Sequence, residues 1–374
     1  MKYERVVHYR NGSSRDFQQT LKNRVEQYFA KQGLSRFATP YMWFKVVFFV
    51  SAFIFLWSRL AFTPHTALST LALLVLFAFS YIFLAFNVSH DAVHNALSGK
   101  AKIDHAIFYL SFNLLGPSAY LWKIRHNNAH HFFVNIPGSD MDIEGTKLLR
   151  VAPHVPWRPM HRFQHLYCVL LYSIFTLHWF FFKDFKILGL KSFGSMTELN
   201  HSKWRYLELV FWKLVYVGFM IIIPILALPY SPLAIIGTYI LFNLFLSTVL
   251  LITFAMSHVA MESHFVEPSS QGNLAHSFYE HQLLTSVDYH SESKIVGFFF
   301  GGFNNHVAHH MFPGICSVHY IPLTQIIRET AKEFALPYNE KNIWELIKSH
   351  FQLMKTLGSS SQQGEQFVVR AVEG

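Results

Sequence analysis

Residues 66–94 read TALSTLALLVLFAFSYIFLAFNVSHDAVH, and this stretch decides the fold. Residues 66–88 are almost entirely apolar, and a helix of about 20 such residues is long enough to cross the hydrocarbon core of a bilayer. The stretch then ends in His90-Asp-Ala-Val-His94. On a helix, residues i and i+4 lie on one face, so the two imidazoles are predicted to point the same way. The stretch therefore joins a predicted membrane span directly to a predicted pair of metal ligands.

Three further stretches are apolar enough to cross a membrane, namely residues 42–62, 206–228 and 232–257. The short links between consecutive spans predict two antiparallel hairpins. Within the first span, Lys45 and Arg59 are expected to extend their charged ends toward the two membrane surfaces.

Two other apolar stretches, residues 106–121 and 166–182, are shorter and carry polar side chains. We interpret both as interfacial or re-entrant helices, with ordinary buried helices of a cytosolic part as the alternative. If either stretch crossed the membrane completely, the histidines that flank it would lie on opposite sides.

The composition is that of an integral membrane protein. Hydrophobic residues make up 52% of the chain and charged residues 14%, below the roughly 25% typical of soluble domains. The net charge of +9 is not accompanied by a basic stripe interleaved with aromatic residues. It therefore predicts contact with anionic lipid headgroups or with a phosphate-bearing substrate, and no nucleic-acid partner. The two cysteines, Cys168 and Cys316, imply neither a disulfide framework nor a zinc site.

Charge also predicts the orientation in the membrane. Residues 1–41 carry eight Lys or Arg against three acidic residues, and the two hairpin turns carry no charge. By the positive-inside rule, both termini, residues 89–205 and the chain after residue 258 are predicted to face the cytoplasm. The predicted division is a cytosolic segment over 1–41, a membrane domain over 42–340, and a C-terminal part over 341–374.

The C-terminal region has two kinds of sequence. Residues 320–357 are amphipathic and predict cytosolic helices packed under the membrane domain. Residues 358–374 are rich in Ser, Gln and Gly and predict a loose tail.

Two more histidine clusters follow the first. They are His126-Asn-Asn-Ala-His130-His131 and His306-Val-Ala-His309-His310. With 23 His in 374 residues, one fixed three-histidine pattern is expected by chance roughly 0.09 times in such a chain. Helical spacing predicts that each cluster offers two or three nitrogens to one point. Imidazole suits iron, zinc and copper, and eight imidazoles exceed the capacity of one ion, so the clusters predict a two-metal site at the membrane surface.

The order HxxxH, HxxxHH and HxxHH around two hairpins resembles the membrane fatty acid desaturase family. The flanking segments, which extend the likeness over roughly residues 40–340, are Trp122-Lys-Ile-Arg-His126, Asn135-Ile-Pro-Gly-Ser-Asp140-Met-Asp142, Ser257-His258-Val-Ala-Met-Glu262, Glu280-His281-Gln282-Leu-Leu-Thr285-Ser286-Val-Asp288 and Gly301-Gly302-Phe-Asn304-Asn305-His306-Val-Ala-His309-His310-Met-Phe312-Pro313-Gly314. These segments are similar to the branch of linoleoyl-CoA and acyl-lipid desaturases.

The resemblance implies an all-α integral membrane fold. Four transmembrane helices in two hairpins would carry a cytosolic helical cap that holds a histidine-rich dimetal site. It also implies that His258, which follows the fourth span, is a ninth ligand. The implied metal-binding and catalytic set is His90, His94, His126, His130, His131, His258, His306, His309 and His310.

Several other side chains are expected near this site. The groups expected to orient the rings are Asp91, Asp140, Asp142, Glu262, Asp288, Asn304 and Asn305, for each of which a cap or turn role is the alternative. Among the remaining histidines, His105 and His281 are expected nearest the site. Arg125, Lys147 and Arg150 are candidates for holding a substrate headgroup.

The family chemistry implied is desaturation of a fatty acyl chain carried on CoA, a carrier protein or a lipid. Two ferrous ions and O2 as co-substrate would supply the oxidising power, since an unactivated C–H bond offers a side-chain base no acidity. A narrow apolar tunnel would hold one C–C bond over the irons. The alternative is a membrane hydroxylase on the same scaffold. A transporter is disfavoured because the histidines lie beyond the span ends.

Two departures from the family pattern carry expectations of their own. Many front-end desaturases have Gln where this chain has His306, which argues against double-bond placement by front-end rules. Many also carry a fused cytochrome b5 motif, which this sequence lacks. We therefore expect electrons from a separate donor, a ferredoxin or a cytochrome b5-like protein.

Overall fold

The computed structural model describes residues 7–10, 15–144, 146–192, 194, 196, 199–360 and 362–370. Within them, four helical segments are long and apolar enough to cross a membrane, namely Pro40–Phe62, Ala67–Val93, Lys203–Ala227 and Pro232–Ala255. The four predicted spans are thus confirmed, each within five residues of its expected ends.

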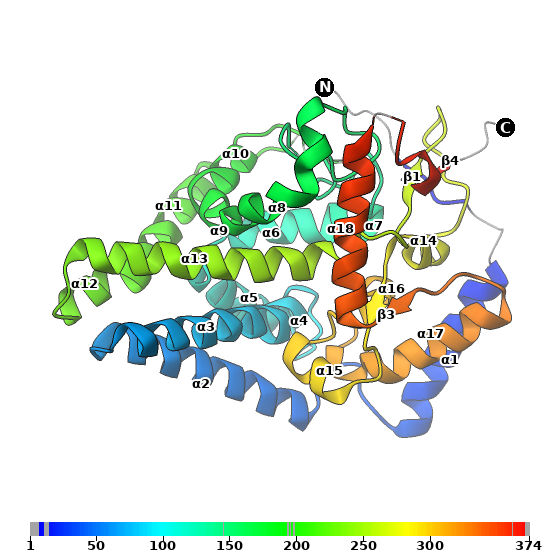
Figure 1. The fold of residues 1–374 in the computed structure, drawn as a ribbon. Coiled ribbons are helices and arrows are strands. Elements are labelled where there is room, and N and C mark those ends of the chain that lie inside the picture. Colours follow the sequence, from blue (N-terminus) through cyan, green and yellow to red (C-terminus); the bar gives the residue numbers. More distant parts are fainter. Residues whose placement is uncertain are drawn as a thin grey trace.

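The spans form two hairpins that pack on each other (Figure 1). The first hairpin is α2 (Pro40–Phe62) and α3 (Ala67–Leu84), and α3 continues through the π-helix η1 (Ala85–Ser89) into α4 (His90–Val93). The second is α11 (Lys203–Val217), η5 (Gly218–Ile222) and α12 (Ile223–Ala227), followed by α13 (Pro232–Ala255). Phe53, Phe77 and Phe242 lie buried between the hairpins.

Side-chain caps define where these helices begin. The Thr66 hydroxyl accepts a hydrogen bond from the backbone N–H of Ser69, and the Ser231 hydroxyl accepts one from Ala234. Pro232 follows Ser231 at the first helical position, where a missing N–H costs nothing. The turns that join the spans are therefore encoded locally, as their sequence predicts.

The two ambiguous apolar stretches form short helices between the hairpins. The first contains α5 (Ala101–Leu114) and α6 (Ala119–Arg125), and α5 is too short to be a candidate span. The second lies in α8 (Gln164–Ser173), α9 (Phe175–His178) and η4 (Trp179–Lys183), followed by α10 (Asp184–Leu188). Residues 159–173 and 175–188 pass the length and apolarity test only together, bent by 60°. This bend fits a re-entrant segment or a broken span, and α8 and α9 both pack on α13.

A helical cap covers one end of the spans (Figure 1). It contains α1 (Arg15–Gln32), α14 (Phe278–Thr285), α15 (Lys294–Phe300), α16 (His306–Met311), α17 (Tyr320–Glu333) and α18 (Ile343–Ser359). Short 3-10 turns lie at η3 (Pro159–Phe163), η6 (Ser317–His319) and η7 (Glu365–Phe367). Leu21, Val307 and Ile327 share one buried cluster, so α1 and α17 support α16 and the third histidine cluster.

Two short parallel sheets complete the described cap. Strand β1 (Phe265–Glu267) pairs with β4 (Val368–Arg370), and β2 (Asp288–Tyr289) pairs with β3 (Glu340–Lys341). The prediction of a loose tail is therefore wrong for residues 362–370. Strand pairing and the burial of Phe367 hold this part of the chain, whereas residues 361 and 371–374 lie outside the described residues.

Arg150 anchors the same region and is not a headgroup ligand, which corrects that expectation. Its side chain is buried, and its guanidinium donates hydrogen bonds to the backbone carbonyls of Pro153, Val155, Leu357, Ser360 and Gln363. It thereby satisfies carbonyl groups at the C-terminal end of α18, which have no helical partner of their own.

We expect Arg150→Met to release the tail without disturbing the histidines. Hydrogen bonds from a charged donor contribute about 1.5–3 kcal/mol each, so the loss should lower the thermal midpoint in detergent and expose residues 358–370 to protease. Metal content should stay at the wild-type value. A variant with an intact, protease-resistant tail would contradict this role.

Lys45 departs from its expected position. Its side chain is buried, donates to the carbonyl of Gly297 at 3.2 Å, and lies 5.4 Å from the centroid of the Phe298 ring. Packing of α15 against the first hairpin provides partners for the charge, so Lys45 does not reach toward the surface. Arg59, at the other end of α2, is exposed as expected.

Candidate metal centre

The nine predicted histidines meet at the cap end of the spans and divide into two groups. Within each group, one nitrogen of every ring lies within 4.8 Å of one nitrogen of every other ring. The first group is His90, His94, His126, His131 and His309, and the second is His130, His258, His306 and His310. Residues from positions 90 to 310 of the chain thus converge on two adjacent points.

The nitrogen spacings fit coordination of an ion. In the first group, the Nε2 of His126 lies 3.2 Å from the Nε2 of His90 and 3.0 Å from that of His131. In the second, the Nε2 of His258 lies 3.1 Å from that of His310 and 2.7 Å from that of His306. Two imidazole nitrogens bound at right angles about 2.1 Å from one ion would be about 3.0 Å apart.

The two groups lie side by side. The rings of His131 and His310, one from each group, are stacked with their centroids 4.4 Å apart. His309 and His310, consecutive in the chain, point into different groups. A two-metal site in which the ions share one enclosed space is therefore compatible with the geometry.

The histidines of the second and third clusters are divided between the two groups, whereas helical spacing predicted that each cluster points to one place. His126 and His130 were expected to point the same way, but His126 pairs with His131. The reason is the π-helix η2 (His126–His130), after which α7 (His131–Phe133) begins. The N–H of His131 bonds to the carbonyl of His126, so residues five apart are aligned. The third cluster is α-helical, and there His306 and His310, four apart, share the second group while His309 turns to the first.

Burial keeps most of these imidazole rings in the neutral form that binds a metal ion. Burial lowers the pKa of His94 to about 3 and likewise the pKa of His258 to about 3. The Nε2 atoms of His94 and His309 are buried and, among the described residues, have no hydrogen-bond partner. Buried polar atoms are normally satisfied, so these two nitrogens fit the role of metal ligands.

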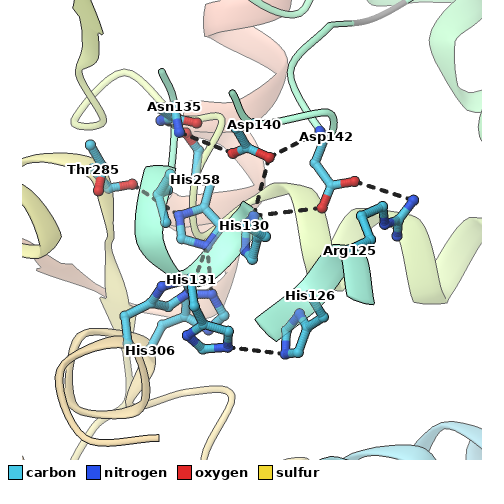
Figure 2. A network of polar contacts seen from close by, with 12 residues as sticks. Arg125, His126, His130, His131, Asn135, Asp140, Asp142, His258, Thr285 and His306 are labelled. Atoms are coloured by element: carbon cyan, nitrogen blue, oxygen red, sulfur yellow. Dashed lines mark hydrogen bonds and ion pairs between the residues drawn. The ribbon is translucent and has the colours of Figure 1, made fainter. Parts of the chain in front are cut away.

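His130 is the exception, because two carboxylates contact it. Its Nδ1 lies 3.4 Å from Asp140 Oδ1 and 3.6 Å from Asp142 Oδ2 (Figure 2). Burial alone would lower the pKa of His130, but Asp140 and Asp142 together raise it. Arg125 Nη1 lies 3.5 Å from Asp142 Oδ1, so Arg125 serves this network and is not free for a headgroup.

Among the described residues, the other five expected orienting groups make no hydrogen bond or ion pair with a ring of the nine. Asp91 accepts hydrogen bonds from Cys316 and Ser317. Asp288 accepts from the backbone of Val307 at 2.9 Å. They fix the backbone segments that carry the first and third clusters. The remaining three bond elsewhere in the cap, namely Glu262, Asn304 and Asn305.

Three ring contacts were not predicted. The backbone carbonyl of Thr285 lies 3.0 Å from His258 Nδ1, the Tyr320 hydroxyl 3.3 Å from His309 Nδ1, and the Trp122 ring stacks on His126 with centroids 4.2 Å apart. Thr285 and Trp122 lie in the family-like segments. Tyr320 lies beyond them, and no sequence signal identified it.

Outside the nine, His281 and His105 were expected nearest the site, and they lie in different surroundings. His281 is buried beneath the second cluster, where its Nε2 lies 2.7 Å from the carbonyl of Val134. His105 is exposed, and its ring is tilted against that of Tyr109 with centroids 4.1 Å apart. No contact described for it reaches a ring of the nine. Lys147 is exposed, and nothing described pairs its charge with the site.

A backbone approach brings the third cluster against the first. Gly301 has φ +56°, and a Cβ there would lie 2.6 Å from the carbonyl of Phe86. Phe86 belongs to η1, the π-helical turn that directly precedes His90. Only glycine combines this left-handed conformation with so close a contact.

Four apolar spans beneath nine convergent imidazoles define a membrane protein with a histidine site suited to two metal ions. The family model for fatty acid desaturases matches residues 64–342. The chain belongs to the fatty acid desaturase family. As a member, it is an oxidoreductase that desaturates a fatty acyl substrate.

Relatives agree with this assignment. The chain is 29% identical to the sn-1 linoleoyl-lipid 6-desaturase of Synechocystis sp., over 93% of this chain and 97% of that protein. It is 30% identical to the protein of the same name from Arthrospira platensis, over 87% and 88%. It is 27% identical to the acyl-lipid (8-3)-desaturase of Physcomitrium patens, over 94% and 74%.

Proposed function

We propose that this chain introduces a double bond into an acyl chain carried on a membrane lipid, using two iron ions, O2 and electrons from a separate donor protein. The observation that carries the proposal is the division of nine imidazoles into two adjacent groups. The lipid-linked substrate is supported by the names of the relatives, which refer to acyl lipids.

Within this proposal, His90, His94, His126, His131 and His309 hold one iron, and His130, His258, His306 and His310 hold the other. Two irons held there would supply the oxidising power of O2, by which two hydrogens leave adjacent methylenes while two external electrons and two protons complete the reduction of O2 to two waters. The protein fixes the rings, keeps them neutral and excludes bulk water. Asp140 holds His130 at Nδ1, and the Thr285 carbonyl holds His258.

An aromatic wall between the spans and both histidine groups supports an apolar substrate. The Phe303 ring lies 4.5 Å from the ring of His90 and 5.7 Å from that of His306, and it stacks on Phe86. A methylene chain held against this face would find no competing polar partner, so alignment of one C–C bond would depend on shape. The narrow apolar tunnel for the acyl chain, expected from the sequence, stays a prediction.

A separate pocket lies away from the site. It has a volume of about 630 Å³ including its mouth and is lined by residues of both hairpins and their turns, among them Phe77, Phe242 and Tyr230. From Phe77 to His90 the chain advances 13 helical residues, which is roughly 20 Å at 1.5 Å per residue. This pocket therefore does not open onto the histidines.

Lipid analysis of a host that expresses the chain tests the proposed function. We expect a new unsaturated acyl chain on membrane lipids, dependent on the host's electron donor, and no activity from the purified chain with NADH alone. A hydroxylated chain would establish the alternative function. The same experiment also gives the position of the double bond. This position is an open question, because two relatives are named 6-desaturases, whereas His306 argues against placement by front-end rules.

Single-cysteine labelling tests the proposed cytoplasmic site. In a chain freed of its two buried cysteines, cysteines would be placed at Ser98, Lys147, Ser231 and Ser360. Only position 231 should react with an impermeant reagent from outside, because it lies in the turn between α12 and α13. External labelling at position 147 would place part of the loop that carries the second cluster on the wrong side and overturn the topology.

A further inference from the structure

A buried ion pair lies among the apolar helices, outside the histidine site. Lys213 Nζ, from the middle of the third span, lies 2.7 Å from Asp184 Oδ2 in α10, and their side chains are only 8% and 1% exposed. Removing two charges from water costs several kcal/mol for each ion. Ionisable residues within membrane segments are therefore rare and are usually kept for a function.

Two further hydrogen bonds of this pair lead to the turn between α5 and α6. Asp184 Oδ2 also accepts the N–H of Ser118 at 2.8 Å. Lys213 donates to the carbonyl of Gly116 at 2.9 Å. Gly116 has φ +100°, and a Cβ there would lie 3.2 Å from the ring of Tyr216. The pair thus holds both sides of a tight turn in which any larger residue at position 116 would be strained.

The turn sets the start of the helix that carries the second histidine cluster. Ser118 is the N-cap of α6, and its hydroxyl accepts the N–H of Leu121. One turn later, Trp122 is sandwiched between Phe112, at 4.6 Å, and His126, at 4.2 Å between ring centroids. α6 then runs without a break into η2 and His126.

A second route leads from Asp184 to the same cluster. Asp184 Oδ1 accepts the indole N–H of Trp179 at 2.9 Å. The Arg125 guanidinium lies 5.3 Å from the centroid of the Trp179 ring, and Arg125 directly precedes His126 and pairs with Asp142. The bent segment of residues 159–188 and the third span therefore both meet the second cluster through Asp184.

We propose that the Lys213–Asp184 pair is a positioning element that fixes where α6 starts and thereby aligns His126, His130 and His131 with the other ligands. These three histidines serve both groups, so a shift of α6 would disturb both metal positions together. Neither residue belongs to either histidine group. The inference rests on the proposed function, because it assumes that the two groups bind metal.

The test measures metal retention in purified full-length chain loaded with Co²⁺, followed by its visible absorption during release to a chelator. The variants are Lys213→Met, which removes the charge and the bond to Gly116, and Lys213→Met with Asp184→Asn, which leaves no unpaired charge. Displaced supporting groups typically weaken metal binding 10- to 100-fold. We expect both variants to release Co²⁺ at least about tenfold faster, with a changed absorption spectrum.

The matched control is Thr176→Val, which removes a buried polar contact from the same bent segment. Thr176 bonds to Asn243 and Ser247 of α13 and has no recorded bond to α6. Thr176→Val should retain Co²⁺ as the wild type does, even if its thermal midpoint falls. If Lys213→Met does not fold, the neutral double variant provides the test.

The outcomes separate the two proposals. A wild-type chain that takes up no Co²⁺ would refute the metal site and the proposed function. A wild-type chain that binds two ions, with folded Lys213 variants that retain them equally well, would overturn the positioning role alone. Equal loss in Thr176→Val would also overturn it, because any destabilisation of the segment would then suffice.

Discussion

Replacing His309 by alanine is expected to abolish alkene formation while the protein remains folded and inserted. His309 lies in the middle of the first group, with ring centroids 4.2 Å from His90, 4.5 Å from His131 and 5.2 Å from His94. Its Nε2 is buried and unpaired among the described residues. Without the His309 imidazole the first group loses one of its five ligands, so the alkene product should fall below detection.

Folding should survive this change because the spans carry their own core. Phe53, Phe77 and Phe242 pack between the hairpins far from the histidines, and α16 remains held by Val307 in the cluster with α1 and α17. Lipid analysis and metal content, expected to fall from two ions per chain to one or fewer, check the prediction. His105→Ala, at an exposed ring, is the matched control. Unchanged product from the His309 variant would remove the third cluster from the catalytic site.

The second large effect is expected for Asp140→Asn. Asp140 is 1% exposed, and its Oδ1 lies 3.4 Å from His130 Nδ1. The negative charge orients the ring and strengthens its other nitrogen as a ligand. A neutral amide of the same shape should weaken metal binding in the second group 10- to 100-fold. The rate should fall with it, whereas KM should change little because Asp140 lies behind the ring.

Asp104→Asn gives a control of equal chemistry. Asp104, in the first turn of α5, is also fully buried. It accepts hydrogen bonds from Ser98 and none from the nine histidines. Metal titration and steady-state kinetics of both variants check the prediction. Wild-type affinity for both ions in Asp140→Asn, or an equal loss in Asp104→Asn, would show that the carboxylate at position 140 does not support the site.

The sequence by itself determined the spans and the set of convergent histidines. A span needs only local length and apolarity, so residues 66–88 and 232–257 could be recognised without any tertiary information. The nine histidines were predicted from clustering, with His258 added by family resemblance, and all nine meet in the structure. The positions of the orienting residues could not be derived in the same way. Asp91 lies inside the first histidine cluster and Asp140 follows the second by nine residues, yet of the two only Asp140 reaches a ring.

Tertiary structure decided how the histidines are shared. The prediction that His126 and His130 point together assumed an α-helix, and the π-helix η2 instead aligns His126 with His131. A π-helical turn is stabilised by its surroundings, here the contacts of α6 and the facing clusters, and it leaves no periodicity in so short a segment. Lys45 and Arg150 were misread for a related reason. Lys45 finds its carbonyl partner at Gly297, and Arg150 finds three of its five at Leu357, Ser360 and Gln363. These partners lie more than 200 residues away and come within reach only once the chain has folded.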